Sequence, residues 1–413
     1  MSNADRISSV LSKPFALPNG DVVKNRLLKS AMSESLGTGA GCPTEALPRL
    51  YRQWADGGIG LMVTGNVMVD RDAFAEPGNV CVDDDRDLPL LQQWASVGKS
   101  GGSLLYMQIS HPGRQVPRFL NPEAVAPSAV PWQPHLERYM AAARALEADE
   151  IHTIVERFAA TARIAAEAGF DGVQIHGAHG YLVSQFLSPH TNQRTDAWGG
   201  SPAGRRKFVL EVIRAIREAT PDDFGIAIKI NSADFQRGGI TEEESMQTIL
   251  SLGEEGLQFI EVSGGTYEAP AMMSGKKSTR EREAYFLSFA EAVRERLRTP
   301  LVVTGGFRSG KAMADAIEGG AVDLVGMARV LAIRPDFPNA LLEEGDVRQE
   351  VPPIKTGIGL VDRLGMTDLL FYERQLHRMG RGQRPAPREN ALKALGMHLL
   401  EVGWKALKPR RAR

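Results

Sequence analysis

The chain of 413 residues is poor in cysteine, in net charge and in long apolar runs, and each shortage excludes a class of protein. Its two cysteines, Cys42 and Cys81, are too few for a disulfide framework, an iron–sulfur cluster or a cysteine-rich zinc site. A net charge of -1 gives no electrostatic basis for a nucleic-acid partner. The sequence has no run of about 18 apolar residues that would predict a membrane span, and its start lacks the basic-then-apolar pattern of a secretory signal. We therefore expect no nucleic-acid and no membrane partner, and a reducing, cytoplasmic setting.

What the sequence does contain is a regular alternation of strand-like and helix-like segments. About eight such units in tandem predict an α/β fold, a closed (β/α)8 TIM barrel. An open doubly wound sheet is the alternative, and the lack of a G-x-G-x-x-G after the first strand weakens it. The expected strands are 24–32, 60–69, 103–110, 170–176, 224–231, 258–263, 300–304 and 322–327.

Capping residues mark where several helices should begin. Asp149, Ser201 and Ser309 each precede a segment with apolar residues at helical spacing, and Thr241 with Glu244 forms a capping box. Further helices are expected at 44–57, 87–99 and 287–298.

The barrel should occupy residues 1–345, followed by a C-terminal, partly helical extension over 346–413 whose role is unknown. Within it, 359–379 is expected to be helical. The basic end, 408–413, predicts a solvated tail, with binding to an acidic partner as the alternative. Two roles are open for the extension: capping the barrel, or joining subunits into a homo-oligomer.

One strand, 170–176, ends in a cluster of proton-transfer groups. Active sites of such barrels lie at the carboxyl ends of the strands. His176, His179 and Tyr181 crowd this end, and glycines between them give the backbone freedom. A lone histidine on a strand is usually a satisfied core residue, and Tyr181 could be a packing aromatic. Two imidazoles and a phenol together favour a catalytic site.

The last two strands end in glycines and an arginine. Phosphates often bind after strands seven and eight of such barrels. Gly305 and Gly306 follow strand seven, and Gly326 and Arg329 end strand eight. Glycine lets backbone N–H groups approach an anion, and arginine adds a charge-assisted contact. The alternative is that these glycines only turn the chain into helices.

Polar residues are also expected inside the barrel. Lys229 alternates with Ile228 and Ile230, so it should point inward and need an anionic or electron-rich partner; an ion pair with Glu261 is the alternative. Gln108 should point inward too, either toward a planar heterocycle or into a core polar network.

The first two strands end in residues that suit a planar ligand. Ala31, Met32 and Ser33 end the first and offer backbone groups and one hydroxyl, and Gly65 at the end of the second leaves room for a flat ring. With the anion pocket, the lysine and the amide, these residues suit a phosphorylated planar cofactor with a proton donor on one face.

Five stretches resemble the Old Yellow Enzyme family of FMN-dependent oxidoreductases. The most specific is 175–202, which contains IHGAHGYL and QFLSPHTNQRTDAWGGSP. The others are KNRLLKSAM at 24–32, QISHPGRQ at 108–115, SGGTY at 263–267 and TGG at 304–306. The likeness covers roughly residues 10–340.

The resemblance implies a bound FMN and a role for each candidate residue. Lys229 falls where the family keeps a cation near the N1 side of the flavin. His176 and His179 fall where a substrate's carbonyl oxygen binds, and Tyr181 where many members keep the proton donor. Residues expected to line the isoalloxazine are Ala31, Met32, Ser33, Gly65 and Gln108; those expected to hold the phosphate are Gly305, Gly306, Gly326 and Arg329.

The family chemistry implies a substrate class. NADH or NADPH reduces FMN, which passes hydride to the β-carbon of an activated alkene while Tyr181 protonates the α-carbon. Ser33 departs from the threonine or cysteine common in relatives, at a position that tunes the flavin potential. Specificity for the small-molecule substrate should come from 112–140 and from 266–285, with its pair Met272 and Met273.

Two other functions compete with this reading. A metal-dependent barrel hydrolase would use His176 and His179 as ligands but lacks a clear third ligand. A non-catalytic flavin-binding module would not explain why candidate catalytic residues stand at the strand ends.

Overall fold

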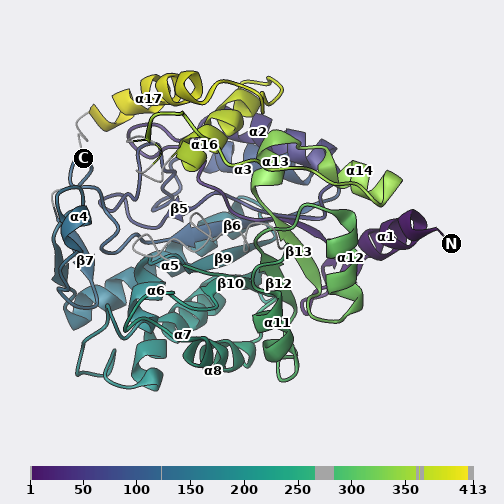
Figure 1. Ribbon diagram of the computed structural model, residues 1–413. Coiled ribbons are helices and arrows are strands. Elements are labelled where there is room, and N and C mark those ends of the chain that lie inside the picture. Colours follow the sequence, from purple (N-terminus) through teal and green to yellow (C-terminus); the bar gives the residue numbers. More distant parts are fainter. Residues whose placement is uncertain (1, 122, 266–282, 360–361, 363–366, 408–413) are drawn as a thin grey trace.

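The computed structural model describes residues 2–121, 123–265, 283–359, 362 and 367–407, and its centre is a closed barrel of parallel strands (Figure 1). Hydrogen bonds join the strands in the order β4, β3, β13, β12, β11, β10, β9 and β6, and a β4–β6 pairing closes the ring. The predicted (β/α)8 barrel is confirmed, and the open sheet is wrong. The strands are β3 (Leu27–Lys29), β4 (Leu61–Val63), β6 (Leu104–Ser110), β9 (Gly172–Gly177), β10 (Gly225–Asn231), β11 (Ile260–Ser263), β12 (Leu301–Thr304) and β13 (Leu324–Met327).

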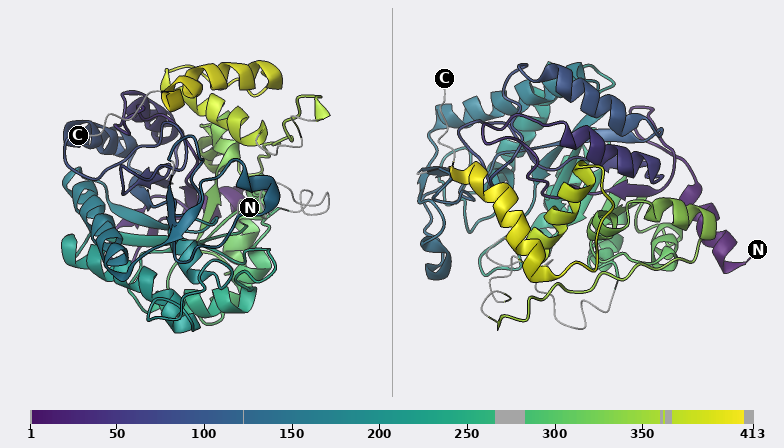
Figure 2. Two further views of the ribbon diagram at one scale, coloured as in Figure 1. Left: turned by 90° about the vertical axis from the view of Figure 1, so that its left-hand side faces the viewer. Right: turned by 90° about the horizontal axis from the view of Figure 1, so that it is seen from above.

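Helices between the strands surround the barrel (Figure 2). At its N-terminal side, α1 (Asn3–Ser12) packs against α12 (Gly310–Glu318) and α14 (Phe337–Glu344), and the hairpin of β1 (Phe15–Ala16) and β2 (Val22–Val23) follows. The surrounding helices are α2 (Ala46–Asp56), α3 (Leu88–Lys99), α5 (Ala148–Glu167), α6 (Leu182–Leu187), α7 (Pro202–Ala219), α8 (Glu242–Gly253), α11 (Leu287–Arg294), α12 (Gly310–Glu318), α13 (Arg329–Ile333) and α14 (Phe337–Glu344).

Strand alternation divides the core into two layers. Ile226, Ile228 and Ile230 of β10 point outward into the large cluster between sheet and helices, whereas Ala227 points inward. The inner layer is small, because only one set of side chains per strand fits the lumen. Its buried members are Leu17, Val23, Leu28, Leu61, Val63, Tyr106, Ala227, Phe259, Val302 and Leu324.

Three of the four predicted caps are confirmed. The side chains of Ser201, Thr241 and Ser309 each accept a hydrogen bond from a backbone N–H of the helix that follows. Asp149 is wrong as a cap: α5 begins two residues earlier, after Glu147, whose N–H donates to the Glu150 carboxylate at 2.9 Å. An acidic run offers several capping oxygens, so the sequence does not fix which one is used.

The connection after β6 is more ordered than its proline content suggests. It carries β7 (Ala124–Ala126), the helical turn α4 (Pro134–Glu137) and β8 (Ala143–Ala145), and β7 pairs with β8. A short strand, β5 (Val67–Met68), also extends the sheet beside the end of β6.

The extension folds back onto the barrel as two helices that pack on each other. The first, α16 (Thr367–Gly380), was expected and contacts α2 and α13; the second, α17 (Ala391–Leu407), was not expected (Figures 1 and 2). The basic end, 408–413, lies outside the described residues. Among the described helices, none combines the length and apolar character needed to cross a membrane.

Candidate active site at the carboxyl ends of the strands

The structure brings the two histidines and the tyrosine after β9 together. His176 is in β9, and the chain then turns sharply, with φ of 58° at His179 and 78° at Gly180. Tyr181 precedes α6. The His176 ring centroid lies 4.5 Å from that of Tyr181 and 5.2 Å from that of His179. The left-handed turn is therefore what folds three residues of one short stretch into a single cluster.

Both imidazoles are neutral near pH 7. Burial, the neighbouring His179 and the charge of Lys229 hold the pKa of His176 well below its usual range. Burial and Lys229 lower the pKa of His179 to about 3. His176 Nδ1 accepts a hydrogen bond from the Ala178 N–H at 3.4 Å, which leaves the proton on Nε2. His179 Nε2 lies 2.9 Å from the Ser263 hydroxyl.

A polar network crosses the barrel interior below this cluster. Lys229 Nζ lies 2.9 Å from a Glu261 carboxylate oxygen. Gln174 Nε2 donates to Glu261 at 2.7 Å and, through its own oxygen, accepts from Gln108 at 2.8 Å. Thr304 donates to Glu261 at 2.7 Å. Although burial alone would raise the pKa of Glu261, the charge of Lys229 and these hydrogen bonds lower it.

Lys229 and Gln108 thus lie inside the barrel as their strand parity predicted. The internal partners weighed for them are also present, since Lys229 pairs with Glu261 and Gln108 joins a core network. The polar network inside the barrel therefore gives Lys229 and Gln108 their partners and holds both side chains below the strand ends.

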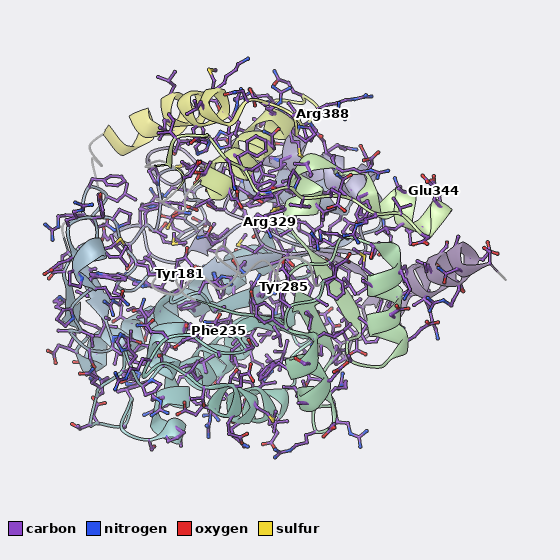
Figure 3. The ribbon with its side chains drawn as sticks, viewed as in Figure 1. Tyr181, Phe235, Tyr285, Arg329, Glu344 and Arg388 are labelled. Atoms are coloured by element: carbon purple, nitrogen blue, oxygen red, sulfur yellow. The ribbon has the colours of Figure 1, made fainter. Side chains whose placement is uncertain are left out.

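The ends of β12 and β13 lie side by side, because Thr304 pairs with Gly326. Gly305 and Gly306 adopt φ of 141° and 91°, and the Tyr285 ring lies so close that a Cβ on Gly306 would approach it to 2.8 Å. Positive φ at two successive residues favours glycine, which also lets the backbone approach a ligand closely. Arg329 begins α13 nearby, between the barrel and the extension, and reaches Asp368 of α16 at 3.5 Å (Figure 3).

Two other glycines have packing reasons for lacking a side chain. A Cβ on Gly326 would lie 1.8 Å from the Thr304 hydroxyl. One on Gly65 would lie 2.7 Å from the Met32 carbonyl oxygen and 2.9 Å from the Glu34 carboxylate. Close packing at the strand ends requires both glycines, whatever else they border.

The segment after β3 has partners that the sequence did not single out, among them Glu76 and Tyr51. Ala31, Met32 and Ser33 follow β3 and are half-buried. The Ser33 hydroxyl donates to a carboxylate oxygen of Glu76, and Glu34 accepts from Tyr51 at 2.6 Å. Glu76 lies 43 positions from Ser33, in a segment without periodicity, so no local pattern could have indicated this contact.

The residues present fit a flavin mononucleotide. The donors after β12 and Arg329 match the charge of a phosphate. Lys229 supplies a cation within the barrel, and Ser33 supplies a hydroxyl at the end of β3. The predicted contributors 266–282, with Met272 and Met273, lie outside the described residues.

A metal site finds no support in the part of the chain that the structure describes. There, no group of three or more histidine, cysteine, aspartate or glutamate side chains is placed to hold a metal ion. His176 and His179 instead have backbone and hydroxyl partners, and no third ligand lies beside them among the described residues.

The comparisons with known proteins agree with this geometry. The model of the NADH:flavin oxidoreductase / NADH oxidase family matches residues 10–345. The NADH-dependent flavin oxidoreductase iliE of Hypocrea jecorina is 36% identical, covering 87% of this chain and 97% of the relative. Its namesake from Neonectria is 38% identical over 84% of this chain but 48% of the relative, so the chain spans about half the length of that protein.

Solved structures show the same fold. A 2-naphthoyl-CoA reductase in complex with 2-naphthoyl-CoA superposes with a TM-score of 0.76 at 25% identity, covering 81% of this chain and 52% of the other. An Old Yellow Enzyme homologue from Zymomonas mobilis gives 0.70 at 23% identity, covering 83% and 94%. The predicted resemblance and the class of oxidoreductase are confirmed: the chain belongs to the NADH:flavin oxidoreductase / NADH oxidase family.

Proposed function

We propose that the protein is an FMN-dependent reductase of activated alkenes, such as α,β-unsaturated carbonyl compounds, with NADH as its reductant. The observation that carries the proposal is the cluster of two neutral imidazoles and a phenol at the end of β9. Bound FMN would supply the hydride chemistry that links NADH to the β-carbon of the substrate. The phosphate would be held after β12 by Gly305 and Gly306, together with Arg329.

The histidines are suited to bind the substrate's carbonyl oxygen. His176 presents Nε2–H because its Nδ1 accepts from the backbone. A neutral imidazole donates a hydrogen bond that strengthens as charge develops on the carbonyl oxygen, which is the effect that usually contributes most to catalysis. With a pKa of about 3, His179 cannot serve as a proton store near pH 7.

The proton for the α-carbon is therefore assigned to Tyr181. Its O–H belongs to the same cluster, and Asn66 Nδ2 lies 3.5 Å from the hydroxyl oxygen. Lys229 would have a separate role, because its positive charge inside the barrel would stabilise negative charge on a bound flavin. Relatives named NADH-dependent flavin oxidoreductases support NADH as the reductant. Parallel assays with NADPH decide the preference.

The experiment separates binding from the two half-reactions. The purified holoprotein should show flavin absorbance, and NADH should bleach it anaerobically. Reoxidation is then followed with a panel of enones, enals and unsaturated thioesters. A His176→Ala/His179→Ala double variant should keep FMN and lose binding of phenolic ligands. A colourless protein that FMN cannot reconstitute would refute the proposal. Failure of the nicotinamide to bleach the bound flavin would support a non-catalytic flavin-binding module instead, and bleaching without reoxidation by any panel member would refute the activated alkene as substrate class.

A further inference from the structure

The contact between Ser33 and Glu76 is built into a rigid corner next to the end of β3. Glu76 Oε1 accepts from the Ser33 hydroxyl and, at 3.1 Å, from Asn79 Nδ2. Asn79 Oδ1 in turn accepts from the N–H groups of Ala75 and Glu76 at 3.0 and 2.9 Å. The carboxyl group is thus held in one place by its own turn.

Helix α16 of the C-terminal extension contacts this corner, since His377 Nε2 lies 2.9 Å from the Glu34 carbonyl oxygen, and it brings a second carboxylate toward Glu76. Glu373 of α16 is 4% exposed and pairs with His398 of α17 at 2.8 Å. Glu34, from the loop after β3, also faces Glu76, and its charge is balanced by Lys29 at 3.4 Å and by the Tyr51 hydroxyl. Among the described residues, no lysine or arginine forms an ion pair with Glu76.

A carboxyl group in these surroundings favours its neutral form. Burial raises the pKa of Glu76 to about 8, and the charge of Glu373 adds to this effect. The hydrogen bonds from Ser33 and Asn79 act in the opposite direction. A protonated carboxyl is a donor as well as an acceptor. When Oε1 carries the proton, it donates to the Ser33 oxygen and still accepts from Asn79, so the Ser33 proton becomes free to point elsewhere.

We propose that Glu76 is a positioning residue that sets the direction in which the Ser33 hydroxyl hydrogen-bonds, and that α16 takes part in this device through Glu373. The proposal rests on the proposed function, in which Ser33 borders the flavin. A carboxylate at Glu76 holds the Ser33 proton away from the cofactor. The acid form releases that proton toward the flavin, where an O–H donor favours the electron-rich reduced form and raises the midpoint potential.

The test is the midpoint potential of the bound flavin, measured by spectroelectrochemistry in the holoprotein between pH 6 and pH 9.5. Glu76→Gln preserves the shape of the corner and does not titrate. Because Asn79 Nδ2 points at this place, the amide oxygen of the variant faces Asn79 and accepts from Ser33 at every pH, as the carboxylate does. Its potential should match that of the unchanged protein at pH 9.5 and lie below it at pH 6. In a Ser33→Ala background the Glu76→Gln substitution should change nothing, and Ser33→Thr, which restores a hydroxyl, should restore the difference.

The part played by the extension has a matched control. Glu373→Gln removes the charge that faces Glu76, so the pH at which the potential of the protein departs from that of Glu76→Gln should fall. Glu389→Gln removes a buried charge of the same extension that lies 3.7 Å from Arg374 instead, and it should leave that pH unchanged.

Two results would overturn the inference. One is a Glu76→Gln difference that does not vary with pH, and the other is a difference that persists in Ser33→Ala. Either result, obtained with FMN bound, leaves the proposed function intact, whereas a protein that binds no FMN overturns both.

Discussion

Mild acid should destabilise the protein because His179 binds a proton in the unfolded chain and not in the folded one. Its pKa is about 3 in the folded protein against 6.5 for an unperturbed histidine. Between those values the unfolded chain binds a proton that the folded chain excludes, so the free energy of unfolding falls as the pH falls below 6.5. The loss is about 1.4 kcal/mol per pH unit, or about 2 kcal/mol at pH 5 from this residue alone.

The substitution His179→Asn isolates this contribution. Asparagine tolerates the left-handed backbone that His179 adopts at φ 58°, and it does not titrate. Urea unfolding at pH 7.5 and pH 5, with saturating FMN in both proteins, should show that the variant loses about 2 kcal/mol less than the unchanged protein. His176 acts in the same direction in both proteins, and burial, the main cause of its lowered pKa, is common to both, so most of its contribution cancels in the comparison. Equal losses in the two proteins would refute the assignment of a neutral, buried His179.

Three further substitutions test other parts of the site. Tyr181→Phe should slow the oxidation of reduced enzyme by an enone by about 10²- to 10⁴-fold, with unchanged reduction by NADH in stopped-flow traces; equal loss in both half-reactions would argue against a proton donor. Arg329→Ala should weaken FMN binding by about 10- to 100-fold and leave riboflavin binding unchanged in fluorescence titrations; similar losses for both ligands would place Arg329 away from the phosphate. Lys229→Met should destabilise the protein by about 3–5 kcal/mol in urea because it leaves the Glu261 charge buried alone, and adding Glu261→Gln should recover much of that loss; no recovery would mean that the pair does not explain the cost.

Sequence patterns predicted the barrel because its constraints are local. Alternation along 224–231 fixed which side chains of β10 enter the lumen, and this placed Lys229 correctly. The His-x-x-His-x-Tyr spacing located the cluster after β9 for a similar reason, since one turn folds it. The weakest local prediction was the cap of α5, where Glu147, Asp149 and Glu150 offer equivalent oxygens.

What the sequence could not predict depends on contacts between distant segments. The internal partners of Lys229 and Gln108 come from other strands. Alternation along one strand showed that each side chain points inward but could not show which partner it contacts. Glu76 and Glu373 were missed because their significance comes from packing of the loop before Asn79 against a helix near the other end of the chain. The second helix of the extension was missed as well, although Asn390 directly precedes residues 391–407 and its side chain accepts a hydrogen bond from the Lys393 N–H at 3.1 Å, as a helix cap does.

Closure of the barrel through β3 has a consequence for how the protein is made. Leu27 of β3 pairs with Val325, about 300 residues further along the chain. At typical translation rates that delay is roughly 15–60 s. During this time β3 exposes an edge that invites pairing with another nascent chain. His377 of α16, which lies 2.9 Å from the Glu34 carbonyl oxygen, emerges later still. The corner that holds Ser33 is therefore completed only after α16 has been synthesised, so protecting the exposed edge of β3 from other nascent chains should raise the yield of folded protein.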